Sequence, residues 1–174
     1  MNWYKDNFNE WKEIIETVAR ETGRNEQMVE KDTIQSIFLN ELSKSDLPFV
    51  FKGGTALSKA YDLIDRFSED IDLSMNRKLT QSERSKSKET IITIADNLGL
   101  ELSNASDIMS RYNYNKYIFK YSSMFSNNPL EIIVETSYYQ TIYLIEQHIL
   151  VVLLENFLCK KCLDLLITSE VANV

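Results

Sequence analysis

The chain has 174 residues, of which 44% are hydrophobic, and it contains only four glycines and two prolines. This length suits a single domain, residues 1–174, with a hydrophobic core, and the composition excludes a disordered chain. The net charge of −7 excludes nucleic-acid binding that relies on the charge of the whole protein.

Two helices are predicted in the N-terminal region, about residues 1–45. Trp11, Ile15 and Val18 recur at helical spacing, and Gly23 is suited to end the first helix. Asn25 can cap a second helix. We expect the apolar face of that second helix to contain Met28, Val29, Ile37, Phe38 and Leu42.

The core of the domain, about residues 48–140, is expected to begin with two strands. Phe49–Phe51 is aromatic and β-branched, and predicts a short buried strand that ends at Gly53-Gly54. Thr55–Leu63 is expected to form a short helix. Polar and apolar residues alternate in Asp70–Met75, which predicts a strand with one polar face.

The next helix is marked at both of its ends. Thr80 and Glu83 have the spacing of a capping box, and Gly99 can terminate a helix that runs to about Asn97. Five basic residues lie in or just before this helix, and we interpret them as a solvated helix face, with a local basic patch as the alternative. These residues are Arg77, Lys78, Arg84, Lys86 and Lys88.

The last part of the chain predicts two more strands and a helical segment. Tyr117–Tyr121 and Leu130–Tyr138 have strand patterns and are separated by the turn signal Ser126–Pro129. Residues from about 145 to 174 are apolar and predict helix. Helices ahead of a mostly consecutive set of strands indicate an α+β domain, with the N-terminal helices packed on a mixed sheet.

The first candidate site lies where the strand Phe49–Phe51 meets Gly53 and Gly54. Two glycines let the backbone approach a ligand closely, and the unpaired N–H groups of a first helical turn attract phosphate. Thr55 could bind a phosphate oxygen, and Lys59 would lie on the same helix face. The alternative is a tight strand-to-helix turn that binds nothing.

The second candidate site is the pair Asp70 and Asp72. On a strand the two carboxylates would project from one face, roughly 6–7 Å apart, and could converge on one magnesium ion. Such a pair suits phosphoryl or nucleotidyl transfer better than nucleophilic catalysis. Arg66 could contact a triphosphate, although a salt bridge to a neighbouring aspartate is an equal alternative. The alternative for the pair itself is a solvated strand face.

A third carboxylate would complete a two-metal site, and Glu135 is our choice for it. The sequence alternates around Glu131 and Glu135, which places both residues on one face of the same strand. Glu135 lies deeper in the strand, whereas Glu131 is close to Pro129 and is expected to face solvent. The alternative is that Glu135 only pairs with a lysine.

The joined motifs resemble those of the AbiEii-type nucleotidyltransferase toxins, which belong to the DNA polymerase β-like nucleotidyltransferase superfamily. The similarity covers roughly residues 25 to 160. The strongest part is the succession of Gly53–Tyr61 and Arg66–Leu73, and the supporting parts are Glu30–Asp32, Phe51-Lys52 and Val134–Ser137.

This resemblance implies a nucleotidyltransferase-like fold and a toxin of a type IV toxin–antitoxin or abortive-infection system. It implies Mg²⁺ and a nucleoside triphosphate, a tRNA 3′ end as acceptor, and a cognate antitoxin protein as partner. Asp70 and Asp72 would be metal ligands, Gly53, Gly54 and Thr55 would hold the triphosphate, and Glu135 would be the third acidic position. Lys59 and Arg66 would neutralise the triphosphate.

The resemblance has one departure, at the C-terminal end. Family members usually continue through a helical half with an essential lysine and an Arg-Asp-bearing helix, and no counterpart of these motifs follows Cys162–Leu166. We therefore expect a truncated C-terminal segment. The alternatives to a nucleotide-transferring toxin are a non-catalytic remnant that binds only nucleotide or antitoxin, and a small-molecule, aminoglycoside-type nucleotidyltransferase.

The remaining features are interpreted as structural. Cys159 and Cys162 form a single Cys-x-x-Cys, which indicates reduced thiols rather than a metal or redox site, and His148 has no partner for a triad. The start of the chain lacks a signal peptide, and Ile149–Leu154 is too short to span a bilayer, so we expect a cytoplasmic protein without a membrane partner. An aromatic group favours sheet packing over base stacking: Tyr112, Tyr114, Tyr117, Phe119 and Tyr121.

Overall fold

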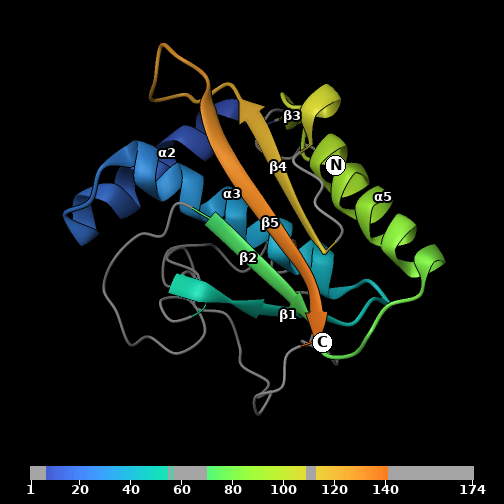
Figure 1. Ribbon diagram of the computed structural model, residues 1–174. Coiled ribbons are helices and arrows are strands. Elements are labelled where there is room, and N and C mark those ends of the chain that lie inside the picture. The colour runs from blue at the N-terminus through green and yellow to red at the C-terminus, as the bar shows by residue number, and fades with distance from the viewer. Residues whose placement is uncertain (1–6, 55, 57–69, 109–112, 141–174) are drawn as a thin grey trace.

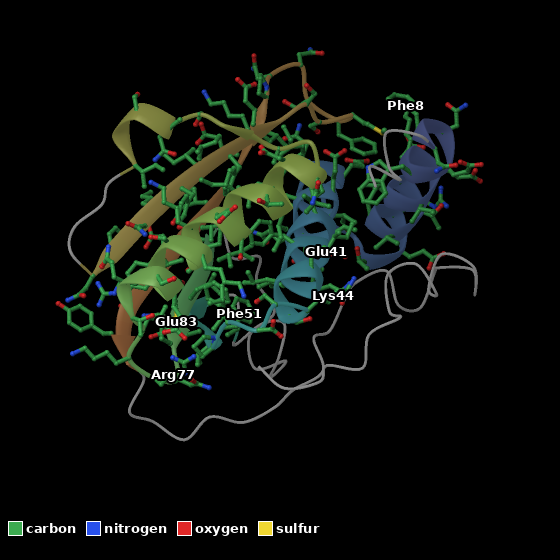
Figure 2. All side chains as sticks on the ribbon, turned by 90° about the vertical axis from the view of Figure 1, so that its right-hand side faces the viewer. Phe8, Glu41, Lys44, Phe51, Arg77 and Glu83 are labelled. Carbon is green, nitrogen blue, oxygen red and sulfur yellow. The ribbon has the colours of Figure 1, made fainter. Side chains whose placement is uncertain are left out.

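The computed structural model describes residues 7–54, 56, 70–108 and 113–140. In this part of the chain a five-stranded sheet forms one layer, and helices form a second layer behind it as seen in Figure 1. The side-on view in Figure 2 has helices α2 (Phe8–Thr22) and α3 (Glu26–Ser43) on one side of the sheet. The prediction of an α+β fold with a mixed sheet is confirmed.

The two N-terminal helices begin and end as their sequence signals predict. Gly23 ends α2 in the left-handed conformation, with φ 66°, where a residue without a Cβ is favoured. Asn25 caps α3, because its side chain accepts a hydrogen bond from the backbone N–H of Gln27 at 2.9 Å. Trp11 and Ile15 of α2 are buried against the rest of the fold.

The predicted apolar face of α3 is wrong at Met28, whose side chain is 51% exposed. Burial begins one residue later at Val29 and then includes polar residues on most sides of the helix. A helix that is packed from several sides shows no narrow apolar stripe, so helical periodicity cannot locate its buried face. The buried polar residues of α3 are Glu30, Asp32, Thr33, Gln35 and Ser36.

The sheet has the strand order β1-β2-β5-β4-β3. Strand β1 (Phe49–Lys52) is antiparallel to β2 (Asp70–Met75), and β2 is parallel to β5 (Leu130–Gln140). Strand β4 (Tyr114–Tyr121) is antiparallel to both β5 and the two-residue edge strand β3, Glu101–Leu102. β2 and β5 therefore lie side by side at the centre of the molecule, as Figure 1 shows in green and orange.

The strand predictions are confirmed, with three extensions and one omission. Strand β1 continues one residue further than predicted, β4 begins three residues earlier, and β5 continues two residues further. Neither β3 nor the short 3₁₀ helix Ala105–Asp107 was predicted, because elements of two or three residues are too short to carry a periodic signal.

The two faces of the sheet differ in what covers them. On the helix-covered face the strands contribute fully buried residues to the hydrophobic core: Ile71, Leu73, Tyr117, Phe119, Ile132 and Val134. Side chains alternate between faces along a strand, so the intervening residues point the other way. Asp70, Asp72, Lys116 and Glu135 are half-buried on that side, whereas Lys120 and Glu131 are exposed. The opposite face therefore carries the charged residues of β2 and β5.

Helix α5 (Gln81–Asn97) lies beside the sheet and begins with the predicted capping box. Thr80 accepts from the N–H of Glu83, and Glu83 accepts from the N–H of Thr80 at 2.8 Å. Arg77 donates to Glu83 at 2.6 Å, and both residues lie near the start of this helix in Figure 2. Of the basic run, Lys78, Lys86 and Lys88 are exposed, whereas the Arg84 guanidinium lies 5.1 Å from the ring centre of Tyr138.

Several sequence expectations fall outside the described residues. These include Thr55, Lys59 and Arg66, the helix expected over residues 55–63 apart from Ala56, which is helical, and the segment from about 145 to 174. Within the described part of the chain, none of the helices has the length and apolarity required to cross a bilayer.

Candidate active site

Four charged residues from four strand segments form one row across the sheet. Lys52 of β1 is in register with Asp72 of β2, Asp72 is in register with Glu135 of β5, and Glu135 is in register with Lys116 of β4. Residues in register on neighbouring strands project from the same face. On the face opposite the helices, the row thus has two carboxylates in the middle and a lysine at each end.

The alternation of β2 positions its two aspartates on this face. Ile71 and Leu73 are buried in the core, and Asp70 and Asp72 between them are half-buried on the other side. Asp70 lies in register with Ile133, two residues before Glu135 on β5. The pairing of β2 with β5 therefore brings Asp70, Asp72 and Glu135 to one region of the sheet.

The turn after β1 lies directly against Asp72. Gly53 has φ +79°, and a Cβ added to it would lie 2.1 Å from Oδ2 of Asp72. A side chain at this position would force Asp72 to shift, and the left-handed conformation independently favours glycine. The predicted neighbourhood of the glycine turn and the aspartates is thereby observed for Gly53 and Asp72.

The environment of Asp72 disfavours its ionised form. Burial raises the pKa of Asp72 above its ordinary value of 3.8, and the negative charges of Glu135 and Asp70 raise it further. The positive charges of Lys52 and Lys116 only partly oppose this increase in pKa. A divalent cation bound to the Asp72 carboxylate would relieve the repulsion between these acidic groups.

Glu135 is held by two donors on β4. Lys116 Nζ lies 2.9 Å from Glu135 Oε1, and the Tyr114 hydroxyl also donates to this carboxylate. Burial raises the pKa of Glu135, but the two hydrogen bonds and the charges of Lys116 and Lys52 outweigh it and lower the pKa below 4.5. Burial and this hydrogen bond raise the pKa of Tyr114 to about 12, so the hydroxyl stays protonated at neutral pH.

The donor set fits a hard divalent cation in chemistry. Mg²⁺ prefers oxygen ligands and binds through one or two carboxylates plus water and phosphate, which Asp70 and Asp72 can provide. In the described part of the chain, however, no three acidic, histidine or cysteine side chains are arranged to hold a metal ion together. On β5, Lys116 and Tyr114 engage the Glu135 carboxylate. A metal site that includes Glu135 stays a prediction.

Sequence reasoning missed Lys52, Lys116 and Tyr114 as members of the site. A signal for Lys116 was available, because Lys116 and Lys120 have the same spacing as Glu131 and Glu135 on either side of one turn. In an antiparallel hairpin this spacing pairs Lys116 with Glu135 and Lys120 with Glu131, as observed. Glu131 is exposed, as expected, and lies 3.8 Å from Lys120.

Two solved structures are similar to this chain. A structure described as a putative nucleotidyltransferase from H. pylori is 20% identical over 66% of this chain and 46% of that chain, with a TM-score of 0.48. A second structure, JHP933 from Helicobacter pylori, is also 20% identical, over 70% of this chain and 50% of that one, with a TM-score of 0.49. Both TM-scores are below 0.5, so these likenesses carry no argument about the site.

The chain spans about half the length of these two structures. No protein with curated annotation matches it significantly. The model of one family, described as the nucleotidyl transferase AbiEii toxin of type IV toxin–antitoxin systems, matches residues 37–171. This match covers most of the chain, including the glycine turn and all three carboxylates, and the chain therefore belongs to the AbiEii nucleotidyltransferase toxin family.

Proposed function

We propose that this chain carries the catalytic site of a metal-dependent nucleotidyltransferase that transfers a nucleotide from a nucleoside triphosphate to an acceptor hydroxyl. The observation that supports it most is the close approach of Gly53 to Asp72, beside Glu135. A glycine turn of this kind can bind phosphate, and the aspartates can bind the metal that accompanies a triphosphate. The two functions would then lie next to each other.

The proposed roles of the residues follow from their chemistry. Asp70 and Asp72 would hold Mg²⁺, which when bound neutralises charge on the triphosphate. The backbone N–H groups at Gly53 and Gly54 would bind phosphate oxygens. Thr55, Lys59 and Arg66 are further proposed contacts of the triphosphate.

In the proposed reaction the acceptor hydroxyl oxygen forms a bond to the α-phosphorus. The bond from that phosphorus to the bridging oxygen of the β-phosphate breaks, and pyrophosphate leaves with the electron pair. Glu135 would take the hydroxyl proton, or would help to bind a second Mg²⁺ that lowers the pKa of that hydroxyl. Its position in register with Asp72 supports either role.

The acceptor and partner are proposed from the family. Since the family consists of toxins of type IV toxin–antitoxin systems, we propose a cognate antitoxin protein as partner. We propose the 3′ hydroxyl of tRNA as acceptor, with a cytoplasmic site of action. The net charge of −7 means that tRNA would bind through local contacts rather than through the charge of the whole protein.

The test is incorporation of each labelled nucleoside triphosphate into total tRNA, with Mg²⁺ present or removed by chelation. Incorporation that requires Mg²⁺ and is lost in Asp72→Asn supports the proposal. Incorporation into an aminoglycoside instead of RNA would replace it with small-molecule modification. Absence of transfer from all four triphosphates, together with retained Mn²⁺ binding, would instead identify a non-catalytic binding protein.

A further inference from the structure

Two lysine–glutamate pairs link β4 to β5 on the same face of the sheet, and they differ in their surroundings. Lys116 and Glu135 are 2.9 Å apart, and their side chains are only 27% and 25% exposed. Lys120 and Glu131 are 3.8 Å apart, and their side chains are 46% and 48% exposed. The first pair is thus the tighter and the more shielded from water.

The two pairs also differ in their distance from the aspartates. Glu135 is in register with Asp72 on β2. Strand β2 begins at Asp70, opposite Ile133, so Glu131 lies beyond the β2–β5 pairing. The Lys116 ammonium is therefore held beside the carboxylates of β2, where a divalent cation would also be attracted.

We propose that Lys116 competes with a divalent cation for Glu135, so that Asp70 and Asp72 hold the first cation and Glu135 becomes a ligand only when Lys116 releases it. This inference rests on the proposed function, because it presupposes a metal at the aspartates. An ammonium group and a divalent cation attract the same carboxylate and repel each other, most strongly where water is partly excluded. Lys116 is in this sense a positioning residue.

Tyr114 acts differently from Lys116 on the same carboxylate. Its hydroxyl donates to Glu135 and is neutral, so it orients the side chain without repelling a cation. A triphosphate brings phosphate oxygens that can accept from Lys116 in place of Glu135. The second metal would therefore enter together with the substrate, and the site would be incomplete before the substrate binds.

The test measures direct binding of Mn²⁺ to the full chain, without substrate or turnover. Electron paramagnetic resonance detects the Mn²⁺ that remains free. The wild type is expected to bind one ion per chain, with a much weaker second site. In Lys116→Met the second ion is expected to bind at least about tenfold more tightly, because a positive charge has been removed a few ångströms away. Lys116→Arg keeps the charge and should bind as the wild type does.

Lys120→Met is the matched control, because it removes the same charge from the same strand and face. It should leave both Mn²⁺ affinities within about twofold of the wild type, as expected for an exposed pair that salt and water screen. Glu135→Gln should not weaken the binding of the first ion. When it is combined with Lys116→Met, it should abolish the gain in affinity for the second ion. Circular dichroism of each variant verifies that it is folded.

Two results would overturn the proposal. One is an unchanged second-site affinity in Lys116→Met, and the other is loss of the first ion in Glu135→Gln, which would make Glu135 a ligand from the start. Both presuppose that Asp72→Asn weakens Mn²⁺ binding. If Asp72→Asn has no effect on Mn²⁺ in any background, the metal site of the proposed function fails as well.

Discussion

Carboxylates lie out of bulk water on both sides of the sheet, but in opposite electrostatic settings. On the helix side, Glu30 accepts from Trp11 at 3.4 Å, from Ser123 at 2.5 Å and from the N–H of Met124 at 3.2 Å. On the open side, Asp72 lies beside two other carboxylates, and its pKa is raised by burial and by their charge. The first arrangement stabilises the fold, whereas the second costs stability that a bound cation would restore.

The partners of a buried carboxylate therefore distinguish a structural acid from a functional one in this chain. Glu30 joins α3 to the turn between β4 and β5, where Gln27 also donates to the carbonyl of Phe125 at 2.7 Å. Its oxygens are used by donors of the protein itself. Acidic residues that lie together despite their mutual repulsion are more often functional, because folding alone gives no reason to group them.

Asp72→Asn is expected to have the largest effect, because it keeps the shape of the side chain and removes its charge. Loss of a metal ligand is expected to lower nucleotide transfer by at least about 10²-fold. The folded protein should become slightly more stable at neutral pH, because a repelled charge is gone. Transfer rates and urea unfolding of the same preparation measure both effects, and a loss of stability would contradict our view of this face.

The pH dependence of stability should also differ between Asp72→Asn and the wild type. The pKa of Asp72 in the folded protein is raised above 3.8, so just above pH 3.8 the folded state binds more protons than the unfolded state. The contribution of Asp72 to stability therefore falls as the pH rises through the folded pKa. Asp72→Asn should remove that fall, and unfolding curves between pH 3.5 and about pH 7 would reveal it.

Glu30→Ala is the reciprocal experiment on the helix side. It leaves the Trp11 indole, the Ser123 hydroxyl and the Met124 N–H without their acceptor, which is expected to lower the free energy of unfolding by about 2–3 kcal/mol. Transfer per folded molecule should be unchanged. Glu30→Gln, which keeps an acceptor oxygen, should lose less; an equal loss in both variants would mean that the charge rather than the hydrogen bonding matters.

Gly53→Ala tests the contact between the turn and Asp72, and Gly23→Ala is its matched control. Both glycines have a left-handed φ, but a Cβ at Gly23 would meet nothing within 4 Å, whereas at Gly53 it would meet Asp72. Gly23→Ala should cost about 1–2 kcal/mol of stability from backbone strain alone. Gly53→Ala should cost more and should also reduce transfer, which unfolding and incorporation assays measure. Equal costs in both variants would show that Asp72 yields freely.

Glu83→Gln gives the smallest expected effect and tests a partly exposed carboxylate at the start of α5. Hydrogen bonds from Arg77 and Thr80 lower the pKa of Glu83 to about 2 from 4.5, so its contribution to stability is present above pH 4.5 and is lost as the pH falls toward 2. This dependence of stability on pH is opposite in direction to the one expected for Asp72. The variant should flatten the acid limb of the stability curve and leave transfer unchanged; a loss of transfer would place the start of α5 in the reaction.

The fold could be read from the sequence wherever local signals set it. Asn25, Gly23 and the Thr80–Glu83 capping box mark helix ends through contacts within a few residues, and the structure confirms all three. The alternation in β2 likewise predicted the common face of Asp70 and Asp72. Local chemistry was sufficient for these features.

The remainder depended on partners far away in the sequence. The exposure of Met28 follows from how α3 is packed, and the row from Lys52 to Lys116 follows from strand order and register. A shift of one residue in register would move every side chain of a strand to the other face, so the row could not be deduced from any single segment. Only the matching spacing of the lysines and glutamates in the hairpin indicated part of this row.

The parallel pairing of β2 with β5 has a consequence for the order in which this site is made. Asp72 and Glu135 are separated by α5, β3 and β4, so a ribosome must synthesise all of these before the second acid reaches the first. Pairings between distant segments form late, after the loop between them has been closed. A growing chain therefore has both of its aspartates long before β5 can bring Glu135 beside them.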